Sequence, residues 1–66
     1  MNLQTNRECA IQEMVRRKCA VMGLQEFEPQ AQLAATNQFK REPTSAHRAI
    51  EAGVECAHRY EMRYLG

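Results

Sequence analysis

The sequence has little of what a nucleic-acid-binding surface is usually built from. It contains no tryptophan and only two tyrosines and two phenylalanines among 66 residues, whereas sequence-tolerant binding of single strands relies on aromatic side chains that stack against bases. Nine lysines and arginines are balanced by eight aspartates and glutamates, which gives a net charge of +1. Nucleic-acid-binding domains are often strongly basic, so the composition favours another class of partner, although it is compatible with a local basic patch.

Long apolar runs and targeting segments are also missing. The longest apolar stretch is Cys19-Ala20-Val21-Met22, and a membrane-spanning helix needs about 20 such residues. The polar start of the chain lacks the basic and then apolar regions of a signal peptide. These features predict a cytoplasmic protein that has no membrane partner.

The few cysteines and histidines do not form a recognisable site. The chain has an odd number of cysteines, Cys9, Cys19 and Cys56, and it shows no secretory signal. We therefore expect these cysteines to act as small apolar residues near helix contacts rather than to form a disulfide framework. The sequence has no CxxC or HxxxH pair, and Cys56 and His58 are two residues apart, which places them on different faces of a helix. We therefore predict no metal and no other cofactor.

Catalytic motifs are missing as well. The chain has no glycine-rich phosphate loop and no HExxH sequence. No motif brings a nucleophile, a base and an orienting group together, and a helical chain of this length leaves little room for a substrate pocket. We therefore predict that the protein is not an enzyme and has no catalytic residues.

The pattern of apolar residues predicts an all-α fold in a single domain, residues 1–66. Residues 11–22 repeat apolar side chains at three- and four-residue steps, Thr5 and Glu8 fit a capping box, and Gly23 followed by Leu24 is typical of a helix end. This predicts a first helix over residues 6–22. Pro29 suits the start of a shorter, less periodic helix over 29–41.

The third predicted helix, residues 45–64, has the clearest pattern, and Thr44 or Ser45 can cap it after Pro43. A heptad-like stripe follows, which Ala49 and Val54 widen; it consists of Ala46, Ile50, Gly53, Ala57, Tyr60 and Tyr64. No period-2 alternation or hairpin turn predicts a strand. Together the helices predict a helical hairpin.

Small residues on the third helix form a shallow groove that suits close approach of another helix. A chain of 66 residues buries a marginal core by itself, so we predict a homodimer. The residues expected in self-association are Ile50, Gly53, Val54, Ala57, Tyr60 and Tyr64. The alternative is that the first helix of the same chain fills the groove with its larger side chains, Ile11, Met14, Val15 and Met22.

Basic residues offer a candidate partner surface at Arg16, Arg17, Arg48 and Arg59. Their spacing also predicts a solvated, charge-paired face. The pairs expected from that spacing are Glu13 with Arg16 and Arg17, Arg48 with Glu51, and Glu55 with Arg59.

A helix-turn-helix is the competing interpretation. Thr44, Ser45, His47 and Arg48 lie at the beginning of the third helix, which is the end that enters the major groove in such motifs. Arg48 would contact a guanine edge, while Lys40 and Arg41 would contact phosphates. The protein would then be a small DNA-binding regulator.

A resemblance is carried by the short length, the polar start and the run Ala46-His47-Arg48-Ala49-Ile50-Glu51-Ala52-Gly53-Val54-Glu55-Cys56-Ala57-His58-Arg59-Tyr60. In these features the chain resembles the small helical accessory proteins of temperate, lambda-like phages. The resemblance implies a role in host takeover or in the lysis–lysogeny decision, through a host or phage partner, and assigns no functional residue. The sequence thus favours a small adaptor or modulator that binds a protein partner.

Overall fold

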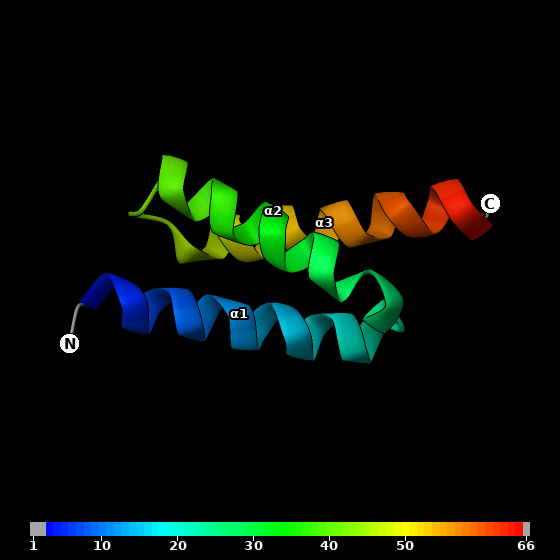
Figure 1. Ribbon diagram of the computed structural model, residues 1–66, viewed down its shortest axis with the longest axis horizontal. Helices are drawn as coiled ribbons and strands as arrows, with labels where there is room; N and C mark the ends of the chain where they lie inside the picture. Colours follow the sequence, from blue (N-terminus) through cyan, green and yellow to red (C-terminus); the bar gives the residue numbers. More distant parts are fainter. Residues whose placement is uncertain (1–2, 66) are drawn as a thin grey trace.

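The computed structural model describes the backbone of residues 3–65 and the side chains of residues 6–64. Its elements, in chain order, are α1 (Leu3–Met22), the short 3-10 turn η1 (Gln25–Phe27), α2 (Glu28–Arg41) and α3 (Ala46–Leu65). Figure 1 shows that α1 and α3 run in one direction and that α2 runs back in the other. The predicted all-α fold is confirmed, and residues 3–65 contain no strand.

The beginning of α1 differs from the prediction. The helix starts at Leu3 rather than near residue 6, so Thr5 lies inside it and does not occupy the N-cap position that the capping box requires. The side chain of Thr5 is outside the described residues. The predicted capping box is therefore wrong, because the backbone of Thr5 is already helical and the helix begins earlier, at Leu3.

The end of α1 is a Schellman motif, as the Gly23-Leu24 pair predicted. Gly23 adopts a positive φ of 73°, which glycine allows without steric cost. The Leu24 N–H donates to the Cys19 carbonyl at 2.7 Å, and the Gly23 N–H donates to the Ala20 carbonyl at 3.3 Å. Leu24 is only 1% exposed, so the same turn ends α1 and directs an apolar side chain into the core.

The ends of α2 and α3 are close to the predicted positions. Pro29 lies in the first turn of α2, where its missing N–H costs no hydrogen bond. Between the two helices, the Ser45 N–H donates to the Glu42 carbonyl at 3.2 Å. Ser45 rather than Thr44 caps α3, since its Oγ accepts the Arg48 backbone N–H at 3.3 Å.

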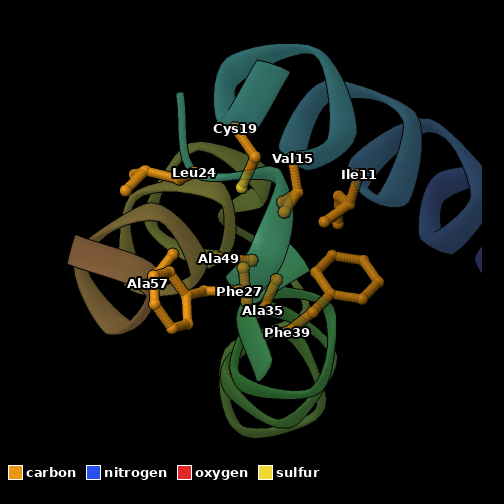
Figure 2. Packing of buried hydrophobic residues seen from close by; sticks show 10 residues of the cluster. Ile11, Val15, Cys19, Leu24, Phe27, Ala35, Phe39, Ala49 and Ala57 are labelled. Carbon is orange, nitrogen blue, oxygen red and sulfur yellow. The ribbon is translucent and has the colours of Figure 1, made fainter. Parts of the chain in front are cut away.

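The core combines large side chains from α1, η1 and α2 with alanines from α2 and α3 (Figure 2). Its buried members are Ile11, Val15, Cys19, Leu24, Phe27, Ala31, Ala35, Phe39, Ala49 and Ala57. Two of the larger side chains expected to fill the groove of the third helix, Met14 and Met22, are instead 40% and 51% exposed.

The helix that fills the groove of α3 is α2 rather than α1. A Cβ atom on Gly53 would lie 2.6 Å from the backbone oxygen of Ala31 and 3.0 Å from the Cβ of Ala35. Small residues thus face small residues, and the two backbones come close together. The expectation that the larger side chains of the first helix occupy this position is wrong, because the alanines of α2 take the space.

Candidate binding grooves

A surface groove of about 480 Å³ lies between α2 and α3, and we call it the basic groove. Its lining residues are Ala34, Asn37, Gln38 and Arg41 from α2, and Ala52, Glu55, Cys56, Arg59, Tyr60 and Arg63 from α3. Because α2 and α3 run in opposite directions, Arg41 in the last turn of α2 and Arg63 in the last turn of α3 mark its two ends. The groove therefore extends along both helices.

The floor and the rim of the basic groove differ in chemistry. Ala34, Ala52 and Cys56 are partly buried small side chains, whereas Arg41 and Arg63 are exposed. Neither of these two arginines makes an ion pair with the part of the chain that the structure describes. They leave the groove with uncompensated positive charge.

One carboxylate lies in the same groove. Glu55 accepts a hydrogen bond from Arg59 at 2.6 Å, one helical turn away. This pair was predicted from the sequence and is confirmed. Since Arg59 already neutralises Glu55, the carboxylate does not cancel the charge of Arg41 and Arg63.

Three aromatic rings are stacked where η1 meets α3. The ring centroids are 6.2 Å apart for Phe27 and Tyr60, 6.3 Å for Phe27 and Tyr64, and 6.1 Å for Tyr60 and Tyr64. The buried Phe27 anchors the two tyrosines. Tyr60, which also lines the basic groove, is therefore held in place by its neighbours.

The predicted partner arginines of α1 both bind Glu13. Arg16 donates two hydrogen bonds to this carboxylate, and Arg17 contacts it at 3.1 Å. The hydrogen bonds from Arg16 and then Arg17 lower the pKa of Glu13 below its ordinary value. The predicted charge-paired face is confirmed here, and the single carboxylate balances one of the two positive charges.

Arg48 pairs with a different carboxylate from the one predicted. Its guanidinium contacts both oxygens of Glu42, at 3.2 and 3.3 Å, while Glu51 pairs with His47 at 2.8 Å. The expected Arg48–Glu51 pair is therefore wrong. Arg48 folds back toward the α2–α3 connection, where Glu42 competes successfully with the carboxylate on its own helix.

The arrangement of α2 and α3 differs from a helix-turn-helix. That motif joins two helices at a crossing of about 90–120°. Here Gly53 contacts Ala31 and Ala35 in the first half of α2. Tyr60 stacks on Phe27, the residue just before α2. The two helices therefore pack against each other in opposite directions, as a helical hairpin.

The six residues predicted for self-association fall into two groups. Gly53 and Ala57 are buried, and Ile50 and Tyr60 pack against the core of the same chain. Val54 is partly exposed and Tyr64 is 67% exposed. The close approach predicted at Gly53 is present, but its partner is α2 of the same chain, so the stripe as a whole is not a free surface.

A second groove, of about 290 Å³, lies between α1 and α3. Its lining residues are Arg17, Lys18, Val21, Met22 and Val54. Val21 is 87% exposed, which is unusual for an apolar side chain in a helix that packs against a core. The groove shares no residue with the basic groove.

The cysteines and histidines do not come together. Cys9 is exposed, Cys19 is buried and Cys56 is intermediate, and all three are free thiols. Within residues 6–64 no three His, Cys, Asp or Glu side chains are grouped so that they could hold a metal ion. None of the helices in the described part of the chain has a span apolar and long enough to cross a bilayer.

Sequence reasoning overlooked Arg63 as a groove residue and gave Arg41 only a phosphate-binding role. Both have a signal in the sequence, because neither has a carboxylate three or four residues away on its own helix. The same criterion selects Lys18 in the second groove, but it also selects Arg7 and Lys40, which line neither groove. Helical spacing therefore narrows the set of candidate cations and does not identify the groove residues by itself.

No protein-family model matches the chain, and no curated protein and no solved structure matches it either.

Proposed function

We propose that the protein is a small non-enzymatic adaptor or modulator that binds an acidic segment of a protein partner in the basic groove. The observation that supports this proposal is the pair of arginines without ion pairs, Arg41 and Arg63, at the ends of a groove with a floor of small residues. Guanidinium groups bind carboxylates through two parallel hydrogen bonds. The small residues between them leave room for side chains of the partner.

The shape of the groove favours a chain over a compact small molecule. Gly53 lies level with the part of α2 between Ala31 and Ala35. Arg41 is therefore about eight residues to one side of that level, and Arg63 is about ten residues to the other. At 1.5 Å per residue the two arginines are roughly 27 Å apart along the helices, which corresponds to about five turns of a helix or about eight residues of an extended strand. We therefore propose a peptide segment with carboxylates at both ends and small or apolar residues in the middle.

The wider setting is also a proposal. Free thiols such as the three in this chain are stable in a reducing compartment, which is consistent with a cytoplasmic protein. The resemblance to small accessory proteins of temperate phages is compatible with an adaptor that acts on a host or phage protein.

The test is selection of a random-peptide library, displayed on yeast, against the purified full-length protein. We expect enriched peptides to carry aspartate or glutamate at two positions separated by apolar or small residues. Affinity for a selected peptide should fall roughly tenfold in Arg41→Gln and in Arg63→Gln, since a hydrogen bond to a charged group contributes about 1.5–3 kcal/mol. Arg16→Gln is the matched control, because Arg16 is exposed and lies outside the groove.

A second measurement locates the bound peptide. Cys56 lines the basic groove, whereas Cys9 is exposed on α1. A saturating peptide should slow the alkylation of Cys56 by a maleimide and leave that of Cys9 unchanged. Selection without acidic enrichment, binding that ignores Arg41 and Arg63, or tighter binding of duplex DNA than of any acidic peptide would contradict the proposal.

A further inference from the structure

The face formed by α1 and α3 has exposed apolar side chains with opposite charges on its two sides, and we call it the α1–α3 face. Its apolar part consists of Met14, Val21, Met22 and Val54, of which Val21 is the most exposed. None of the residues that line the groove in this face comes from α2. The face is therefore independent of the basic groove.

The charges of the α1–α3 face are separated by helix. On α1, Arg17 and Lys18 line the groove, and Lys18 makes no ion pair within the described part of the chain. On α3, the partners of Glu51 and Glu61 in the described part of the chain are histidines, His47 at 2.8 Å and His58 at 3.8 Å. Neither of these two carboxylates pairs with a lysine or an arginine within the described residues.

We propose that the α1–α3 face binds a second copy of this chain, with α1 of each copy against α3 of the other. A two-fold axis that lies in the interface and runs parallel to the helices produces this arrangement. Rotation about it places α1 of one copy opposite α3 of the other. Basic residues of each copy then meet acidic residues of its partner, and the apolar side chains meet in the middle. An axis across the helices would instead place Lys18 opposite its own copy, which like-charge repulsion disfavours.

The heights of the residues along the helices agree with this pairing. Lys18 and Val54 line the same groove, so they lie at similar heights. Glu51 precedes Val54 by one helical turn, about 4.5 Å along the axis. A rotation about an axis parallel to the helices preserves height, and the lysine of one copy therefore comes within reach of Glu51 of the other.

The dimensions of the molecule are compatible with a dimer through the α1–α3 face. The molecule measures 41 × 20 × 15 Å, so the outline of its broadest side is comparable with the roughly 800 Å² that each partner contributes to a standard interface, and α1 and α3 are its two longest helices. A chain this short also gains most from burying apolar side chains against a partner. The interface differs from the one predicted from the sequence, because Gly53 and Ala57 are already buried within the chain.

Sedimentation equilibrium of the full chain over a range of concentrations tests the proposal. We expect a molar mass of twice 7.6 kDa for the wild type, and a monomer for Lys18→Glu and for Glu51→Lys at the same concentration. The double variant should return to a dimer. An equimolar mixture of the two single variants should also dimerise, because both cross-copy contacts are then restored.

Control variants separate the interface from the fold. Val21→Glu, at a position 87% exposed, should dissociate the dimer and keep the helical circular dichroism signal, whereas Leu33→Glu on α2, 64% exposed, should keep the dimer. A wild type that is monomeric at all concentrations, dimeric single charge variants, or a dimer lost in Leu33→Glu would overturn the proposal. Binding of a selected acidic peptide by Lys18→Glu reports separately on the basic groove.

Discussion

The Cβ position of Gly53 in α3 lies 2.6 Å from the backbone oxygen of Ala31 in α2. Real Cβ atoms do not come this close to a backbone oxygen, so only glycine fits here unless one helix moves. In an exposed helix, glycine is about 1 kcal/mol less favourable than alanine. The contact explains why a helix with an otherwise favourable sequence contains glycine near its middle.

Gly53→Ala is therefore expected to destabilise the protein, although alanine has the higher helix propensity. The added methyl group meets backbone, which cannot rotate away, and overpacking of this kind costs about 1–3 kcal/mol. Urea denaturation followed by circular dichroism measures the change. Ala10→Gly, at an exposed position inside α1, provides the propensity control. An unchanged or higher stability of Gly53→Ala would show that α2 and α3 do not approach so closely.

Much of the fold could be predicted from local sequence signals. Gly23, Pro29 and Ser45 each act within one turn of the chain, and the structure places a helix boundary at each of them. The start of α1 could not be predicted in this way, because Thr5 resembles a cap and the residues before it carry no contrary signal. Local signals identify where a helix is able to begin, and they do not exclude an earlier start.

The order of packing was harder to predict than the helices. The sequence showed a groove of small residues around Gly53, but it did not show which helix would fill it. Ala31 and Ala35 were part of a segment with weak periodicity, and alanine gives little hydrophobic contrast. Hydrophobic contrast therefore favours the larger residues of the first helix for this groove, whereas close backbone packing requires small residues on both sides.

The candidate sites depend on contacts between elements, and sequence reasoning found them only in part. The Glu13 and Glu55 pairs follow from helical spacing and were predicted. The Arg48–Glu42 pair depends on the conformation of the α2–α3 connection, which spacing does not encode. The basic groove likewise exists only because α2 packs along α3, so Arg63 was not identified beforehand.

Gly23→Ala and Gly23→Asn test the turn that ends α1. No atom beyond Gly23 and its two neighbours in the chain lies within 4 Å of an added Cβ, but the φ of 73° is unfavourable for a side chain. We expect Gly23→Ala to cost about 1–2 kcal/mol, and Gly23→Asn to cost less, because asparagine tolerates the left-handed conformation better than alanine does. Thermal unfolding of the three proteins checks this order. Equal stability of both variants and the wild type would contradict the Schellman motif.

The cysteines are expected to react with a maleimide in the order Cys9, Cys56, Cys19. Cys9 is exposed and Cys19 is 0% exposed, so Cys19 should react only when the chain unfolds. Mass spectrometry of tryptic peptides at increasing labelling times measures each rate. Labelling of Cys19 as fast as Cys9 under native conditions would contradict its position in the core.

Cys19 also predicts a loss of stability at alkaline pH. Burial raises the pKa of this thiol above its ordinary value, so the folded state holds the proton more tightly than the unfolded state does. The stabilisation that the protonated thiol gives the folded state is complete below the ordinary pKa and is lost as the pH rises through the pKa of the folded state. We expect the urea midpoint of the wild type to fall more steeply than that of Cys19→Ala between neutral pH and about pH 10. If the urea midpoints of the two proteins fall equally with pH, Cys19 is not the cause of the loss of stability.

Phe39→Ala should be the most damaging of the single substitutions. Phe39 is 1% exposed and comes from α2, and Figure 2 shows its ring beside Ile11 of α1. Truncating a buried phenylalanine costs about 3–5 kcal/mol, while a domain of this length has about 3–10 kcal/mol in total. We expect a large loss of cooperative unfolding by circular dichroism. Leu33→Ala, on the same helix but 64% exposed, should change stability little, and a similar effect of both substitutions would mean that α2 is not anchored through Phe39.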